Sequence, residues 1–292
     1  MKRIAVLAAA LVVLAAPLAR AAEGWRFGMQ GDALHDDNAT RGIYDGAKSD
    51  NLVSVEGDAT RSSLLTPQSG LVLRGLGRYT AYDKLSDLSN LVLGLRAAWR
   101  IQPSLGFDSP WYEIAGEAQR LIFPDSDLRD GMLFSADASV GAYLTDRMRV
   151  SGGFGLDQRN GGGSAGVFDY TQNRLFGTFD LRVGINTAVY AKLTRIGGDQ
   201  VFSSGSVSGL APPGNWADDP ALRGPLGLTT ANIYKIDATT FAWELGVNVP
   251  FGPSRSFDFG IARYDSKVNE GAASGQSYSA TLLRASVLYR FQ

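Results

Sequence analysis

The chain contains no cysteine and a single histidine, His35. Without cysteine there is no disulfide framework, no thiolate metal site, no thiol nucleophile and no cysteine to carry a lipid anchor after a leader peptide. Packing and hydrogen bonds must therefore hold the fold. We expect no metal site and no cofactor.

Long apolar runs are also scarce. The only one covers residues 4–18, and its 15 residues fall short of the roughly 20 that a transmembrane helix needs. Two basic residues precede this run and an Ala-Arg-Ala cleavage site follows it at 19–21, which is the layout of a secretory signal peptide. The sequence therefore predicts a removed leader, 1–21, followed by a single domain, 22–292. A helical membrane protein is excluded.

Charge of one sign is not abundant either. The whole chain carries a formal charge of -1, which becomes -4 when Lys2, Arg3 and Arg20 leave with the leader. A general nucleic-acid binder carries a strongly basic surface. We therefore expect no nucleic-acid partner.

The C-terminal segment carries the most informative pattern in the chain. From Thr281 onward, apolar or small residues alternate with polar ones. The apolar set is Leu283, Ala285, Val287, Tyr289 and Phe291, and the polar set includes Arg284, Ser286 and Arg290. A period of two residues predicts a β-strand with one apolar and one polar face.

Similar alternation recurs along the chain and predicts about twelve strands. They cover 25–35, 51–64, 70–83, 90–102, 111–123, 131–145, 148–159, 171–184, 187–197, 234–250, 255–265 and 278–291. Most are longer than the about 9 to 11 residues of a tilted membrane strand, whereas strands in soluble sheets usually have about five or six. The predicted fold is all-β: an up-and-down antiparallel transmembrane β-barrel of about twelve strands, with 10 or 14 as alternatives.

The predicted connections alternate in length. Short ones cover 65–69, 103–110, 146–147, 185–186 and 251–254, and longer ones cover 36–50, 84–89, 124–130, 160–170, 198–233 and 266–277. Short turns at one end and longer loops at the other are typical of bacterial outer-membrane barrels.

With its alternating strands and a terminal strand that ends on Phe291, the chain resembles the Gram-negative outer-membrane β-barrel proteins. This resemblance implies an outer-membrane location reached through the cleaved leader, with both termini and the short turns in the periplasm. It also implies contact with outer-membrane lipids and lipopolysaccharide. The outer-membrane assembly machinery is a further expected partner, acting through the C-terminal strand.

Aromatic residues are expected to form two girdles at the membrane interfaces. The periplasmic girdle would contain Trp25, Trp99, Trp111, Tyr112, Phe251, Phe257, Tyr289 and Phe291, and the opposite girdle Tyr79, Phe123, Phe134, Tyr234 and Tyr264.

The polar set of each strand is largely charged, and such residues would cost roughly 2 to 4 kcal/mol per Arg or Lys at the middle of the lipid face. We therefore expect them in the lumen. The candidate lumen-lining residues are Arg74, Arg78, Arg96, Arg100, Glu56, Glu113, Glu117 and Asp137. Counting from the centre of each connection pairs Arg78 with Arg96, Arg74 with Arg100, Glu56 with Arg78, Glu117 with Arg96 and Glu113 with Arg100. These rows are interpreted either as salt bridges that fill the barrel or as a basic strip that sets the selectivity of a solute path.

The connection 198–233 is unusually long, and such a connection is either functional or disordered. A mobile surface loop is the favoured expectation. The alternative is a constriction folded into the pore mouth, with Asp218, Asp219 and Arg223 as its polar edge. Twelve strands give a backbone radius of about 12 Å, so inward side chains leave a narrow opening.

No catalytic residue is assigned. His35 stands in H-D-D-N, and a lipid-directed hydrolase could use such a histidine as a general base. The outer-membrane phospholipase, a twelve-stranded barrel, has a H-x-S-N-G segment, but Asp37 occupies the serine position here. The first functional hypothesis is a narrow porin-like channel for ions or small solutes. The second is a non-conducting structural or surface-interaction barrel that acts through its loops, and a hydrolase is third.

Overall fold

The computed structural model describes residues 24–43, 47–163, 166–184, 186–204, 216–227, 230–269 and 275–291. The predicted leader, 1–21, lies outside them. The strands are β1 (Trp25–Asp36), β2 (Asp50–Thr66), β3 (Ser69–Tyr82), β4 (Asn90–Ile101), β5 (Trp111–Ile122), β6 (Gly131–Tyr143), β7 (Met148–Gly161), β8 (Tyr170–Val183), β9 (Thr187–Ser204), β10 (Trp216–Asp218), β11 (Asn232–Pro250), β12 (Arg255–Val268) and β13 (Ser277–Phe291). The helical segments are η2 (Ser86–Leu88) and α2 (Pro220–Leu226). Neither is long and apolar enough to cross a membrane.

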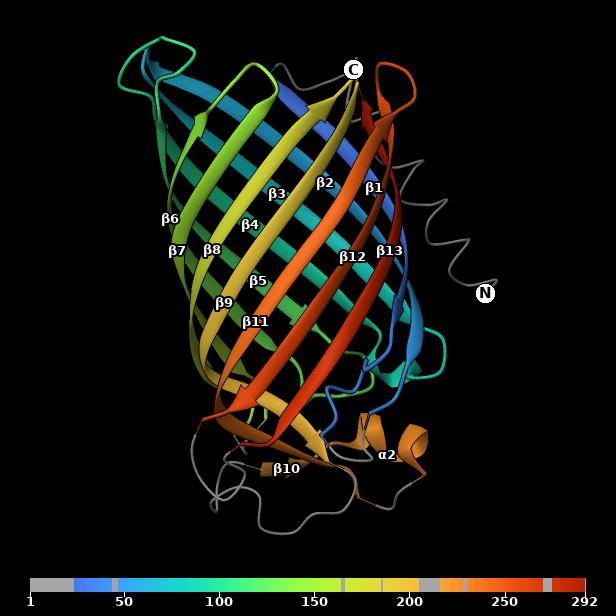
Figure 1. Ribbon diagram of the computed structural model, residues 1–292. Helices are drawn as coiled ribbons and strands as arrows, with labels where there is room; N and C mark the ends of the chain where they lie inside the picture. Colours follow the sequence, from blue (N-terminus) through green and yellow to red (C-terminus); the bar gives the residue numbers. More distant parts are fainter. Residues whose placement is uncertain are drawn as a thin grey trace.

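Twelve of these strands form a closed antiparallel barrel (Figure 1). Strands β1 to β9 and β11 to β13 each pair with their neighbours in sequence, and β13 pairs with β1 from Phe27–Phe291 to Asp36–Leu282. The ring also requires β9 to pair with β11, and the short strand β10 is added to the outer part of β11. The predicted up-and-down barrel of twelve strands is confirmed.

Strand β4 illustrates why this sequence forms a barrel with an apolar outside. Leu93, Leu95 and Trp99 point outward, and Leu95 keeps 72% of its surface exposed. The alternate residue Val92 is only 3% exposed. Because side chains alternate across a strand, an apolar outer face places the polar residues between them on the concave face.

The connections divide the barrel into two ends. The short-turn end holds the turns at 67–68, 102–110, 144–147 and 251–254 together with the first and last barrel residues, Trp25 and Phe291. The long-loop end holds the connections that include η2, β10 and α2. This end is at the bottom of the barrel in Figure 1, where β10 and α2 are labelled. Except for the turn at 102–110, short and long connections alternate as predicted.

The aromatic residues at the short-turn end mostly point outward. Phe251 and Phe257 stack with ring centroids 4.2 Å apart, and Tyr289 and Phe291 meet edge to face at 4.7 Å. Trp111 is an exception, because it has the parity of Glu113 and lies under the Arg100 guanidinium at 4.5 Å. Its assignment to the girdle was wrong, since an inward position on β5 places the ring in the lumen.

The opposite girdle needs a larger correction. Tyr79 and Phe134 lie on the outward parity, whereas Phe123 and Tyr234 are buried. Tyr264 lines a cavity inside the barrel. Tyr234 and Tyr264 occupy inward positions on β11 and β12, so neither ring can belong to a girdle on the lipid-facing side.

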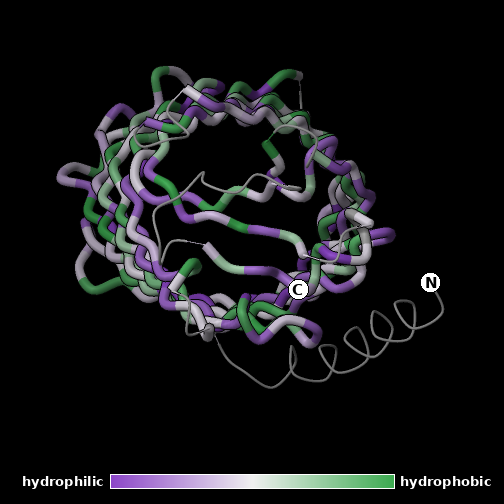
Figure 2. Tube along the Cα trace, turned by 90° about the horizontal axis from the view of Figure 1, so that it is seen from below, coloured by the Kyte–Doolittle hydropathy of each residue, from purple (hydrophilic) through white to green (hydrophobic). Residues whose placement is uncertain are grey.

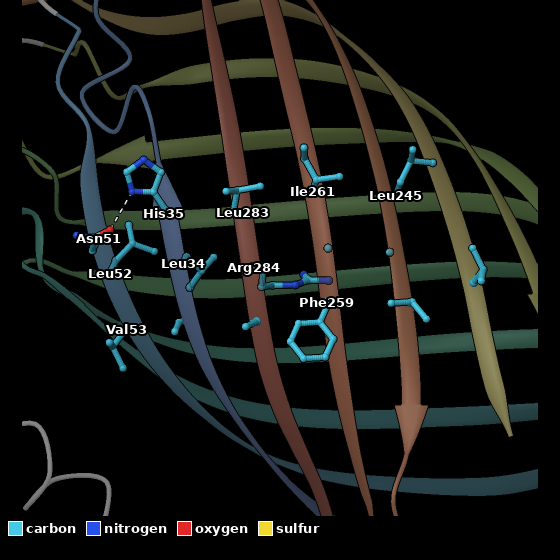
Figure 3. A pocket seen from close by; sticks show the side chains of 16 residues that line it. Leu34, His35, Asn51, Leu52, Val53, Leu245, Phe259, Ile261, Leu283 and Arg284 are labelled. Carbon is cyan, nitrogen blue, oxygen red and sulfur yellow. Dashed lines mark hydrogen bonds between the residues drawn. The ribbon is translucent and has the colours of Figure 1, made fainter.

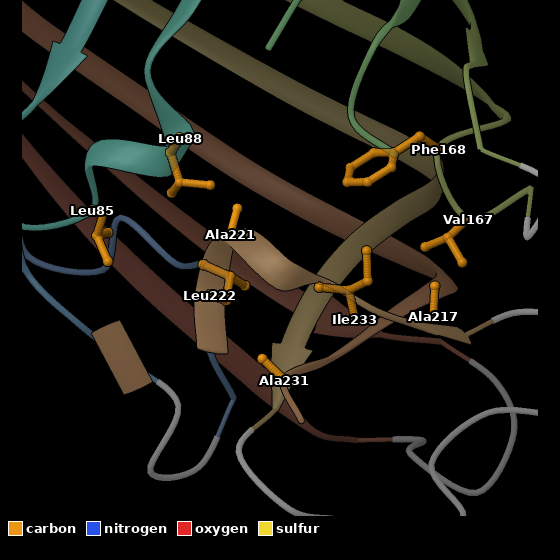
Figure 4. Packing of buried hydrophobic residues seen from close by; sticks show 9 residues of the cluster. All are labelled: Leu85, Leu88, Val167, Phe168, Ala217, Ala221, Leu222, Ala231 and Ile233. Atoms are coloured by element: carbon orange, nitrogen blue, oxygen red, sulfur yellow. The ribbon is translucent and has the colours of Figure 1, made fainter. Parts of the chain in front are cut away.

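An apolar core lies at the long-loop end, and we call it the mouth core (Figure 4). Side chains from η2 and its flank, the β7–β8 connection, β10, α2 and the start of β11 pack together there. Its members are Leu85, Leu88, Val167, Phe168, Ala217, Ala221, Leu222, Ala231 and Ile233. Seen along the barrel axis, segments of this region cross the ring of strands (Figure 2). The long connections thus converge on the barrel mouth.

The connection predicted for 198–233 is shorter than expected. Strand β9 runs on to Ser204 and β11 begins at Asn232, because their inward residues, such as Phe202 and Ile236, pack in a second apolar cluster. Within the connection, β10 and α2 fold into the mouth core. The expectation of a mobile surface loop was wrong for these described residues, because their apolar side chains find a packing site inside the mouth.

Candidate functional site

The concave face of the barrel is lined by ion pairs that reach across several strands. Side chains two strands apart meet there because the wall curves toward them. Arg174 on β8 shows this directly: it contacts Asp157 on β7 at 2.5 Å and Asp137 on β6 at 2.8 Å. Ser135 donates a further hydrogen bond to Asp157 at 2.6 Å.

A second group surrounds Arg96 on β4. Its guanidinium lies 3.2 Å from Glu113, 3.8 Å from Glu117 and 3.2 Å from Asp137. Arg100 donates two hydrogen bonds to Glu113, at 2.7 and 3.0 Å. Asp137 thereby joins the Arg96 and Arg174 groups into one network across β4 to β8.

The third group lies on β2 and β3 and continues to β13. Arg74 contacts Glu56 at 2.6 Å and Asp58 at 3.6 Å, and Arg78 lies 3.9 Å from Glu56. Arg290 contacts Asp58 at 3.1 Å. The eight lumen-lining candidates from the sequence thus all take part in ion pairs on the concave face.

The register corrects two of the predicted pairs. Arg74 lies opposite Arg96, and Arg78 lies opposite Val92. The prediction was wrong because the β3–β4 connection is not symmetric. On the β3 side, the Asp83 amide still donates to the Asn51 carbonyl of β2, and on the β4 side η2 forms a helical turn just before β4 begins. The other pairs, Glu56 with Arg78, Glu117 with Arg96 and Glu113 with Arg100, are confirmed.

A fourth group joins β9, β11, β12 and β13 around Arg284. Its Nη2 donates to Glu244 at 3.0 Å, to Asp258 at 2.9 Å and lies 2.7 Å from the Tyr190 hydroxyl. Tyr190 itself donates to Asp258 at 2.9 Å. Its ring reaches across β11 at Gly246, where an added Cβ would overlap the ring. Tyr190 is not among the residues predicted from the sequence, although its inward parity, shared with Lys192, was a usable signal.

Acids and bases in these pairs differ in their exposure. Glu56, Asp58 and Glu113 have side chains only 16%, 8% and 15% exposed. Their partners Arg78, Arg100 and Arg290 are 43%, 53% and 59% exposed. The short carboxylates lie against the wall while the long guanidinium arms extend over them. The water-facing surface of these pairs is therefore cationic, although their formal charges nearly cancel.

The three loop candidates hold β10 and α2 in place. Asp219 is fully buried, contacts Arg129 of the β5–β6 connection at 2.6 Å, and caps α2 by accepting the Ala221 amide at 3.1 Å. Asp218 accepts from Arg223 and from the Ala231 amide. The hydrogen bond from Arg223 holds the pKa of the Asp218 carboxyl below its ordinary value.

Asp50 is a structural residue that the sequence did not predict. Its buried carboxylate accepts the Lys84 and Leu85 amides at 3.0 and 2.8 Å. It therefore ties the start of β2 to the segment before η2. Only the folded loop reveals this role, because the two segments are 34 residues apart.

The outer wall carries a shallow apolar depression over β1, β2, β11, β12 and β13 (Figure 3). His35, Leu283, Ile261 and Leu245 form one row of it. His35 lies on the outer face near the long-loop end of β1, and its Nδ1 is 2.8 Å from the Asn51 side-chain oxygen. Neighbouring Asp36 is paired with Arg41 at 2.7 Å.

A closed antiparallel barrel with an apolar exterior and a charged interior defines the class: the chain has the fold of the outer-membrane β-barrel proteins. An outer-membrane channel from Pseudomonas putida F1 has a similar fold, with a TM-score of 0.59 and 12% identity over 93% of this chain and 97% of that one.

Two further structures align with lower similarity. The CymD monoaromatic hydrocarbon channel gives a TM-score of 0.49 at 12% identity, over 94% of this chain and 90% of that one. The KdgM porin in complex with disordered oligogalacturonate gives 0.43 at 8% identity, over 91% and 99%. No protein-family model matches the sequence, and no curated protein matches it.

Proposed function

We propose that the protein is a narrow, porin-like channel of the outer membrane for ions and small solutes, and that its lumen favours anions. The observation that carries this proposal is the exposure of the arginines, because the guanidinium groups of Arg78, Arg100 and Arg290 face the water of the lumen. A solute that crosses the barrel meets these groups before it meets the carboxylates behind them. Cationic linings of this kind select anions in pores.

The fold is compatible with this function, since the Pseudomonas putida channel shares it. The lumen-lining residues that we assign to the path are those of the sequence analysis, from Glu56 on β2 to Asp137 on β6. Their ion pairs also brace the wall, so both interpretations of the charged rows apply to the same residues.

The experiment is a planar-bilayer recording of purified protein. Discrete conductance steps are expected, with a reversal potential in a KCl gradient that indicates preference for chloride. Steps with cation preference would contradict the proposed lining. A well-folded barrel that produces no steps would contradict the channel itself.

A second function is favoured by one specific observation, the mouth core. Its buried residues come from five parts of the chain and cover the long-loop end, which suits a non-conducting barrel that presents its loops to a partner. Replacing residues 216–226 with a flexible linker of equal length separates the two functions. A channel constricted by this segment gains conductance, whereas a structural barrel stays silent.

We also infer that the leader directs export and that the outer wall contacts membrane lipids and lipopolysaccharide. The assembly machinery would act on β13, which closes the barrel against β1. His35 bonds to the side-chain amide of Asn51 on the outer wall, which gives no support to a hydrolase that uses this histidine as a general base.

A further inference from the structure

We propose that a recess in the lumen wall, lined by Arg174, Lys192, Thr194, Glu244 and Tyr264, binds a small organic anion such as a carboxylate. This inference deepens the proposed channel function, because it names a solute class and a place where that solute pauses. The recess has a volume of about 180 Å³. Pockets for drug-sized ligands measure about 300–1,000 Å³, so the size suits a smaller molecule.

Strand register brings these residues together. Thr194 on β9 lies opposite Ala242 on β11, which lies opposite Tyr264 on β12. One row toward the short-turn end, Lys192 lies opposite Glu244. One row from Thr194 toward the long-loop end, Arg174 on β8 lies opposite Ile196 and also lines the recess.

Several hydrogen-bond donors around this recess have no partner among the described residues. The Lys192 amine makes no ion pair or hydrogen bond there, and neither does the Tyr264 hydroxyl or the Thr194 hydroxyl. Arg174 uses Nε and Nη2 for Asp157 and Asp137, which leaves Nη1 without a described partner. Four donors, two of them cationic, are therefore available around one cavity.

The nearby carboxylates are already committed to other cations. Glu244, which faces Lys192 in the register, accepts from Arg284 at 3.0 Å. Asp137 and Asp157 are both held by Arg174. Within the described ranges, Lys192 is thus a lumen cation without an ion-pair partner, and an anion entering the recess would supply one.

The recess also has an apolar side, which argues for an organic anion. Ile196, Ala242 and Tyr264 line it together with the charged groups. A flat aromatic ring accommodates an apolar or aromatic body, while the amine and guanidinium hold a carboxylate. An inorganic anion would contact only the charged residues of the recess.

The position along the barrel favours retention. Just beyond the recess toward the long-loop end, the buried Thr240 hydroxyl donates to Gln200 at 2.6 Å and contacts Ser266 at 2.8 Å. Phe202, Ile236 and Val268 form an apolar cluster behind this layer. A solute that enters from the short-turn end reaches the recess directly beneath the covered mouth.

The test uses the full barrel refolded in detergent, with benzoate as the probe and benzamide as its neutral isostere, measured by titration calorimetry. Benzoate should bind at least about tenfold more tightly than benzamide, because a hydrogen-bonded charge pair contributes to benzoate alone. Lys192→Met should weaken benzoate binding about tenfold or more. This variant should keep the fold, because the Lys192 side chain has no ion pair or hydrogen bond with the part of the chain that the structure describes.

Arg78→Met is the matched control, since it removes another exposed lumen cation outside the recess. Benzoate affinity should stay within about twofold of the parent. Equal weakening by both variants would show that benzoate responds to the electrostatic potential of the whole lumen, and would contradict specific binding in the recess. Absence of benzoate binding to the parent, or unchanged affinity in Lys192→Met, would also overturn it.

Bilayer recordings separate this inference from the channel proposal. A barrel that binds benzoate but never conducts overturns the channel and leaves the recess intact. A barrel that conducts but does not bind benzoate overturns the recess alone. Where both hold, added benzoate should reduce the current in the parent, and Lys192→Met should require about tenfold more benzoate for the same reduction.

Discussion

Arg129 and Asp219 form a buried ion pair, with 2.6 Å between Nη2 and Oδ2. The pair joins the β5–β6 connection to α2, because Asp219 is the N-cap residue of this helix. Removing one partner of a buried pair costs about 3–5 kcal/mol because the other charge is left uncompensated. Arg129→Met should therefore release β10 and α2 from the mouth. The expected result is a larger single-channel conductance and faster proteolysis between 216 and 227, with the barrel itself intact.

Arg223→Met provides the comparison for that variant. The Arg223–Asp218 pair is substantially exposed, and exposed pairs contribute only about 0–1 kcal/mol. Conductance and proteolysis should stay close to the parent. If both variants behave alike, the buried pair does not hold the mouth closed.

Acidification should weaken the local hydrogen bonds that Asp218 accepts, without releasing the whole segment. The pKa of this carboxyl is lowered in the folded state by the hydrogen bond from Arg223, so it stabilises the fold above the unfolded pKa of about 3.9. The contribution is lost as the pH falls through the lowered pKa. The Ala231 amide, which donates to Asp218 at 2.8 Å, should lose exchange protection below about pH 4. In Asp218→Asn, the part of the pH dependence that belongs to this carboxyl should disappear.

Reversing the exposed lumen cations should change ion selectivity. Arg78→Glu combined with Arg100→Glu places two carboxylates where guanidinium groups face the lumen, so the preference should shift toward potassium. Reversal potentials in a KCl gradient measure the shift. Arg147→Glu makes the same charge change per site in a turn at the short-turn end and should shift selectivity by much less than half as much as the double variant. A large shift with Arg147→Glu alone would assign selectivity to the rim.

Gly246 is required where the Tyr190 ring crosses β11. A Cβ at this position would overlap the ring and force it away from Asp258, so Gly246→Ala should destabilise the barrel by about 1–3 kcal/mol. Urea unfolding in lipid measures this loss. Gly31→Ala is the control, since an added Cβ there meets nothing within 4 Å. A Tyr190→Ser background should remove most of the Gly246→Ala penalty.

Two substitutions in β13 should distinguish assembly in cells from insertion into pure lipid. Phe291→Asp places a charge near the interface, where it costs only about 0–1 kcal/mol, but it alters the C-terminal signal. Cells should therefore insert much less of this variant, while refolding in pure lipid is nearly normal. Leu283→Asp lies on the outer wall and is 50% exposed there, so it should impair refolding in pure lipid. Normal behaviour of both variants would contradict the register of β13.

The sequence alone determined the barrel, because strands that cross a membrane must alternate lipid-facing and lumen-facing residues over their whole length. It therefore placed twelve strands, the two kinds of connection and the candidate lumen charges from Glu56 to Asp137. Pairing across short turns was also predictable, since a short turn leaves little freedom in register. Glu56 opposite Arg78, across the turn at 67–68, is one such pair.

Only the tertiary structure decided what happens in the long connections and across the lumen. Because of a helical turn inside the β3–β4 connection, Arg74 lies opposite Arg96. No local sequence pattern predicts that this connection is asymmetric. The mouth core and the recess at Lys192 depend on side chains far apart in sequence that meet because the sheet closes on itself. Parity along a strand specifies which face a residue occupies, whereas curvature and loop packing decide which residues it meets there.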